Sequence, residues 1–173
     1  KMQYAAHATV SSTARLINGL SSIYDNLFVG HHELMLEFDK EEGLKCFDKQ
    51  DYKNAITYFS SYLENCNDSD AEVVFLLAQS HVSLEEYEKA VEYFKKARKL
   101  EGADADIVVE FAHCLLAMED YVEAGKCFKL AIEMVPDEAD HYYCLGSCCE
   151  KAEQIEEAKS MYKKAIDLSP REA

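Results

Sequence analysis

The chain has 173 residues, 49% of them apolar, so it is long enough for one domain with a sizeable core and too apolar for a disordered chain. It carries 33 acidic residues against 18 Lys and Arg, a formal net charge of −15. An acidic surface repels nucleic-acid phosphates and anionic lipid headgroups, so neither nucleic acid nor a membrane is an expected partner. No apolar run approaches the roughly 20 residues that a membrane span needs.

Residues 4–29 predict an amphipathic helix that precedes the rest of the fold. Its apolar residues recur at spacings of three and four, which places them on one helical stripe, and Gly30 is a natural stop after it. The stripe consists of Leu16, Ile17, Leu20, Ile23, Tyr24, Leu27 and Phe28. We assign residues 1–32 to this N-terminal element. Two interpretations stay open: a cap on the following helices, or an oligomerisation or partner-binding helix.

Residues 33–173 predict four pairs of helices. Only two prolines and six glycines are present, too few for a β-fold with a turn every ten residues, whereas the Ala, Leu, Glu and Lys content favours helix. The expected helices are 33–48 and 51–65, 69–83 and 86–99, 104–117 and 120–133, and 137–150 and 154–168.

One pattern recurs every 34 or 35 residues in the second helix of each pair. An alanine is followed four residues later by an aromatic residue, and each unit closes on a helix breaker. The pairs are Ala55 with Phe59, Ala90 with Phe94, Ala124 with Phe128, and Ala158 with Tyr162, and the breakers are Asn67, Gly102, Pro136 and Pro170. Small alanines let two helices approach, and the aromatic ring fills the space between them. A single such unit cannot bury its apolar face, so the units must stack.

Residues 36–173 resemble the tetratricopeptide repeat, whose consensus is Trp-x2-Leu-Gly-x2-Tyr, then Ala-x3-Phe, then Pro. The last unit matches best, with Tyr142, Leu145 and Gly146. The first unit is the poorest match, because Asp39 takes the tryptophan position and Glu42 takes the leucine position. The resemblance implies an all-α fold, a right-handed α-α superhelix preceded by the N-terminal amphipathic helix.

The resemblance also implies that the first helices of successive units line a concave groove. Carried over by register, the groove has an apolar and aromatic floor with an acidic rim, which suits an apolar or amphipathic peptide with some positive charge. The candidate binding residues are Lys40, Leu44 and Phe47 in the first unit, Phe75, Leu76 and Gln79 in the second, Val109, Glu110, His113 and Leu116 in the third, and Tyr143 and Ser147 in the fourth.

The carboxylate clamp by which some members of the family grip acidic chaperone tails is not expected in this chain. That clamp needs cations in the third unit, where the register places Asp106 and Glu110, and asparagines where it places Leu44 and Leu76. Only Lys40 matches. Two carboxylates in place of cations would repel an acidic tail.

The seven cysteines favour a reducing, cytoplasmic location, since their odd number does not suit a disulfide framework. Cys144, Cys148 and Cys149 with His141 form the most metal-like cluster, but Cys148 and Cys149 fall on packing positions, where a small soft residue fits well. We therefore expect no metal and no cofactor. No phosphate-binding loop, nucleophile elbow or metalloprotease motif is present, so the chain is not expected to be an enzyme.

The sequence thus predicts a protein–protein interaction scaffold. Two alternatives stay open: a chaperone similar to the class II chaperones of bacterial type III secretion, which keep hydrophobic translocators soluble, and a regulatory module of a larger protein or complex. Self-association is a further expectation, through the N-terminal helix or through apolar residues of the last helix such as Ile155 and Ile166.

Overall fold

The computed structural model describes residues 32–66, 69–101 and 104–169, all of which lie in helices or in short turns. Residues 32–48 are helical. The helices that follow are α2 (Tyr52–Asn65), α3 (Ala71–Ser83), α4 (Tyr87–Glu101), α5 (Ala105–Ala117), α6 (Tyr121–Met134), α7 (Ala139–Lys151) and α8 (Ile155–Leu168). Within the described ranges the fold is all-α, as the sequence predicts, and the helix ends agree to within a few residues. The predicted N-terminal helix over 4–29 lies outside the described residues.

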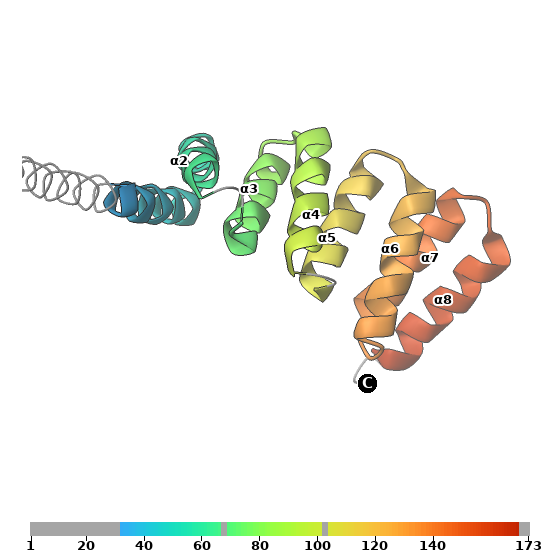
Figure 1. Ribbon diagram of the computed structural model, residues 1–173. Coiled ribbons are helices and arrows are strands. Elements are labelled where there is room, and N and C mark those ends of the chain that lie inside the picture. Colours follow the sequence, from blue (N-terminus) through green and yellow to red (C-terminus); the bar gives the residue numbers. More distant parts are fainter. Residues whose placement is uncertain (1–31, 67–68, 102–103, 170–173) are drawn as a thin grey trace, which may run out of the picture.

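The helices form an open solenoid in which each packs on the next. Figure 1 shows them in a single row in chain order, ending at α8. Contacts join α2 to α3, α3 to α4, and so on to α8. The core therefore runs along the row instead of collecting in one centre, which is the expected property of stacked repeats.

The recurring alanine and aromatic positions form this core. Phe59, Phe94 and Phe128 are completely buried, and burial of one such side chain contributes about 1.5–3 kcal/mol. The alanines before them are also inaccessible to solvent. In the last pair Ala158 is buried, but Tyr162 is only partly covered. The recurrence read from the sequence is thus the pattern of helix-to-helix contact.

The turn inside each pair uses a left-handed residue that is not glycine. Gln50, Glu85, Glu119 and Glu153 have φ between 59° and 62°, a conformation that costs a residue with a side chain about 1–2 kcal/mol. Backbone hydrogen bonds hold the turn: in the third pair the Glu119 N–H donates to Leu116 at 3.0 Å, and the next N–H donates to Leu115 at 2.8 Å. Equivalent bonds close the other three turns. Each turn is therefore a helix C-cap of one repeated geometry.

The first two helices, residues 32–48 and α2, pack against each other despite their poor match to the repeat consensus. Asp39, at the tryptophan position, is only 6% exposed and accepts a hydrogen bond from Ser61 Oγ at 2.6 Å. Gly43 lies directly against the ring of Phe59. A buried polar pair and a close helix approach thus replace the large side chain that the consensus has at this position.

Among the described residues, no helix is long and apolar enough to cross a membrane.

Candidate peptide-binding groove

The candidate residues occupy equivalent positions on the first helix of each pair. Lys40, Phe75, Val109 and Tyr143 share one position, and Leu44, Gln79, His113 and Ser147 share the position one helical turn later. Leu44, Phe47, Leu76 and Leu116 are half-buried and pack against the core. Gln79, Glu110 and Ser147 are also half-buried, whereas His113 and Tyr143 are exposed.

Lys40 is held by its own chain. Its Nζ donates to Asp70 at 2.8 Å and to Glu72 at 3.2 Å, and it lies 5.8 Å from the centroid of the Tyr62 ring. The Tyr62 hydroxyl donates to the same Asp70 oxygen at 2.8 Å. Asp70 in turn caps α3 by accepting from the Val73 N–H at 3.2 Å. Lys40 therefore joins the first unit to the second through ion pairs that the sequence register does not reveal.

The charges of this junction shift its pKa values. Burial acts to raise the pKa of Asp70, but the hydrogen bonds from Lys40 and Tyr62 outweigh it and hold that pKa below its usual value. Burial, followed by the hydrogen bond to Asp70, raises the pKa of Tyr62 to about 12. The carboxylate is thus stabilised in its charged form, and the phenol in its neutral form.

Two aromatic candidates for peptide binding, Phe75 and Phe47, pack against the core of their own unit. The Phe75 ring meets the Phe94 ring edge-on with centroids 5.8 Å apart. Phe47 contacts Tyr52 and Phe59 at centroid distances of 5.7 and 6.5 Å. These rings are partly buried, so one face of each is used in folding and only the remaining edge can meet a partner.

Val109 and His113 lie together in a pocket between α5 and α7, which we call the inner pocket. Its volume is about 320 Å³, and the His113 ring stands edge-on to Phe128 with centroids 5.3 Å apart. The lining residues are Ala105, Asp106, Val109, His113, Phe128, Val135, Glu138, Asp140, His141 and Cys144. Val109 and His113 are the candidate residues that line this pocket.

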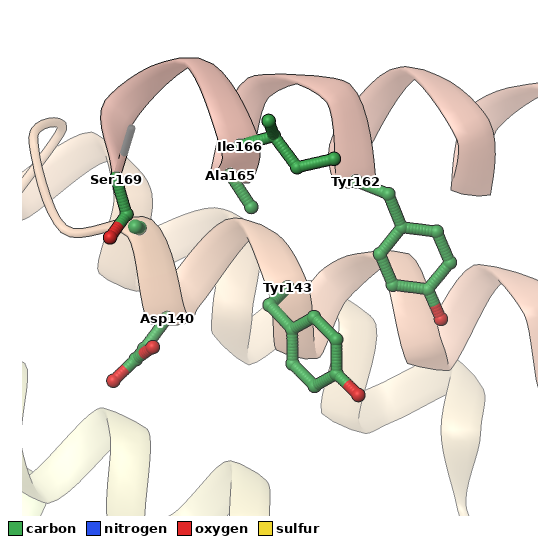
Figure 2. Close-up of a pocket in the computed structure, with 7 residues that line it drawn as sticks. Asp140, Tyr143, Tyr162, Ala165, Ile166 and Ser169 are labelled. Carbon is green, nitrogen blue, oxygen red and sulfur yellow. The ribbon is translucent and has the colours of Figure 1, made fainter. Parts of the chain in front are cut away.

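Tyr143 lies in a separate pocket of about 450 Å³ between α7 and α8, which we call the end pocket. Figure 2 shows the Tyr143 and Tyr162 rings together, with the Asp140 side chain at the other side of the pocket. The ring centroids are 5.5 Å apart. The Tyr162 hydroxyl donates to Glu150 at 2.7 Å, and burial, followed by this bond, raises its pKa to about 12.

The two pockets are the same surface in successive units. Five lining residues of the end pocket, namely Ala139, Asp140, Tyr143, Tyr162 and Ser169, correspond at an offset of 34 residues to Ala105, Asp106, Val109, Phe128 and Val135 of the inner pocket. Within the described residues, the inner pocket is also lined by the first helix of the next unit, through Asp140, His141 and Cys144 of α7. Phe128, Val135 and Glu138 are not among the candidates, because they come from the second helix and from the connection between units. The 34-residue register does not pair them with Val109, because it relates equivalent positions of different units and not the residues that touch across helices.

All seven cysteines are free thiols. Cys148 and Cys149 are 1% and 3% exposed, as the packing interpretation of the sequence predicts. Burial raises the pKa of Cys114 and of Cys148 to about 12, so neither forms a reactive thiolate near neutral pH. Within the described ranges no three His, Cys, Asp or Glu side chains are placed to hold a metal ion.

Comparisons with known proteins agree with this architecture. Residues 48–131 match a family model described as "Anaphase-promoting complex, cyclosome, subunit 3", and residues 139–172 match one described as "Tetratricopeptide repeat". No curated protein matches the chain.

Solved structures similar to this chain include MamA, residue 41 to the end, from Desulfovibrio magneticus RS-1. It is 23% identical with a TM-score of 0.74, and the match covers 80% of this chain and 77% of that chain. YrrB, described as "a TPR protein with an unusual peptide-binding site", is 28% identical with a TM-score of 0.69, and the match covers 75% of this chain and 66% of that chain. Residues 139–172 thus carry a tetratricopeptide repeat, and the described chain has the fold of tetratricopeptide repeat proteins such as YrrB.

Proposed function

We propose that the chain is a scaffold that binds an apolar or amphipathic peptide with some positive charge along the first helices of its units. These helices are residues 32–48, α3, α5 and α7. The observation that carries the proposal is the inner pocket, because there Val109 and His113 border about 320 Å³ that the chain's own side chains leave open. Half-buried Leu76 and Leu116 add apolar surface on the same helices. A few apolar anchors of this kind are enough to dominate the affinity of a peptide.

Charge supports the same partner. The net charge of −15 attracts a basic peptide and repels an acidic one. Lys40 is the one residue of this chain that matches the carboxylate clamp, and its positive charge is already paired with Asp70 and Glu72. The solved structure of YrrB, 28% identical, is described as having a peptide-binding site, which favours a peptide as the ligand here as well. A reducing, cytoplasmic setting suits the seven free thiols.

The experiment is selection of binding peptides from a random displayed library on the whole chain, followed by titration against a matched pair of variants. Val109→Arg adds bulk and positive charge to the inner pocket and should abolish binding of the selected peptides. Val122→Arg makes the same change on α6 of the same unit, at a side chain that is 63% exposed and outside that pocket, and should leave binding unchanged. Circular dichroism melting must show that both variants stay folded. Equal binding by both would contradict the proposal.

The chaperone and the regulatory-module alternatives use the same helices and differ in the ligand. A secretion chaperone should select long apolar segments and keep a hydrophobic translocator soluble, whereas a regulatory module should select a short segment of one protein. The selected sequences distinguish the two.

Self-association through the end pocket is part of the proposal. Ile166 is 68% exposed and Tyr143 is 61% exposed there, and such apolar surface is more often covered in an assembly than left in water. Sedimentation velocity of the wild type and of Ile166→Glu tests this: the proposal expects a dimer that the variant loses. A wild type that sediments as a monomer at micromolar concentration would contradict it.

A further inference from the structure

Among the described residues that line the inner pocket, the Asp and Glu side chains are not matched by any lysine or arginine. Asp106 comes from the first turn of α5, Glu138 is the N-cap residue of α7, and Asp140 lies in the first turn of α7. The Glu138 side chain makes no capping hydrogen bond. No lysine or arginine is among the lining residues, and in the described part of the chain none of these three side chains takes part in an ion pair. The pocket therefore presents negative charge that no lysine or arginine among its described lining residues neutralises.

The floor of the same pocket is apolar. Val109, Phe128, Val135 and Cys144 line it. The pocket thus combines apolar side chains with carboxylates from two helices.

We infer that the inner pocket binds an arginine side chain of the peptide, with its methylene stem on the apolar floor and its guanidinium among the three carboxylates. Arginine fits better than lysine because its planar head offers five N–H donors in different directions, whereas the lysine ammonium is a compact point charge. The donors can reach acceptors on α5 and on α7 together. This inference rests on the proposed function and names the side chain that fixes the register of the peptide.

The end pocket supplies an internal comparison. It shares five register positions with the inner pocket, yet among the residues that the structure describes Asp140 is the only charged one that lines it. Glu138, His113 and His141 line the inner pocket alone. The acidic character is therefore not a general property of the repeat, because it arises where α7 adds a second wall.

The experiment uses the peptides selected on the whole chain. Each is synthesised with arginine and with citrulline, which has nearly the same shape but no charge, and is titrated against wild type, Asp106→Asn and Asp137→Asn. Asp106 lines the inner pocket, whereas Asp137 is exposed beside it and does not line it. The two variants lose the same charge by the same substitution. Both sites are on the surface, so both variants should fold, and melting curves verify this.

We expect an arginine at one fixed position of the selected peptides. Its replacement by citrulline should lower affinity at least about tenfold in wild type and in Asp137→Asn, but no more than about threefold in Asp106→Asn. Selected peptides without a basic position, peptides with lysine there, or an equal citrulline effect in both variants would overturn the inference. If those peptides still lose binding on Val109→Arg, the proposed function stands. If no peptide is selected, or if Val109→Arg binds like wild type, both fail.

Discussion

Replacing a buried helical glycine by alanine gives opposite expected effects at two places in this fold. Alanine stabilises a helix interior by about 1 kcal/mol relative to glycine. At Gly125 the new Cβ would lie 3.6 Å from Cβ of Cys148 and 3.7 Å from a methyl carbon of Leu145, which is ordinary contact. Gly125→Ala should therefore raise the free energy of unfolding by about 1 kcal/mol.

At Gly43 the same change meets a ring that has no space to move. The new Cβ would lie 2.5 Å from Cε1 and 2.6 Å from Cδ1 of Phe59, and Phe59 is fully buried. Overpacking of this kind costs about 1–3 kcal/mol, which exceeds the gain in helix propensity. Gly43→Ala should therefore lower the free energy of unfolding by about 1 kcal/mol. Ala78 and Ala112 occupy the equivalent position in the next two units and are buried, so other helix pairs of this fold accommodate alanine at this position.

Urea unfolding of wild type and the two variants, followed by circular dichroism, measures the difference. The expected separation between Gly125→Ala and Gly43→Ala is about 2 kcal/mol. If Gly43→Ala proves as stable as Gly125→Ala, then the close approach of the first two helices is not what sets the packing of Phe59.

Two other predictions concern the turns and the first junction. Glu119→Gly should stabilise the chain by about 1 kcal/mol, because glycine adopts φ near 62° without strain, whereas Glu123→Gly, in the first turn of α6, should destabilise it by about 1 kcal/mol. Equal shifts of both thermal midpoints would contradict the strain argument. Asp70→Asn keeps a good N-cap residue but loses the ion pair with Lys40, so it should cost about 1 kcal/mol at neutral pH. Because the folded pKa of Asp70 is depressed, this stabilisation is present above the usual carboxyl range and is lost as the pH falls through the folded pKa. The difference between variant and wild type in urea titrations should therefore disappear in acid, and a difference independent of pH would contradict the assignment.

The helices and their pairing could be predicted from the sequence because both follow from one local recurrence. An alanine and an aromatic residue four positions apart, repeated at a near-constant interval, specify which face of each second helix is buried. The four turns could not be predicted in the same way. Gln50, Glu85, Glu119 and Glu153 are poor residues for the left-handed conformation, so residue type carries no signal there and the packing of the two helices imposes the geometry.

The candidate site was predicted less completely than the fold. Register placed Val109 and His113 correctly on one helix, but the pocket around them also needs residues from α6, from the next connection and from α7. Register likewise placed Lys40 on the first helix of its unit without showing that Asp70, 30 residues later, accepts a hydrogen bond from its ammonium group. Contacts between units depend on where neighbouring helices cross, and a one-dimensional repeat does not contain that information.

The reactivity of the buried cysteines can report where the solenoid opens locally. The seven thiols of the chain are distributed over the first, third and fourth units, and those of Cys114 and Cys148 are kept protonated and covered by the folded stack. A thiol reagent can reach such a group only while the helices around it are apart. Since stacked repeats separate unit by unit, the order in which the buried sulfurs of the third unit (Cys114 and Cys127) and of the fourth (Cys148 and Cys149) react traces the order in which these two units detach. Peptide mapping of a labelled sample would then read local stability along the row without any added probe.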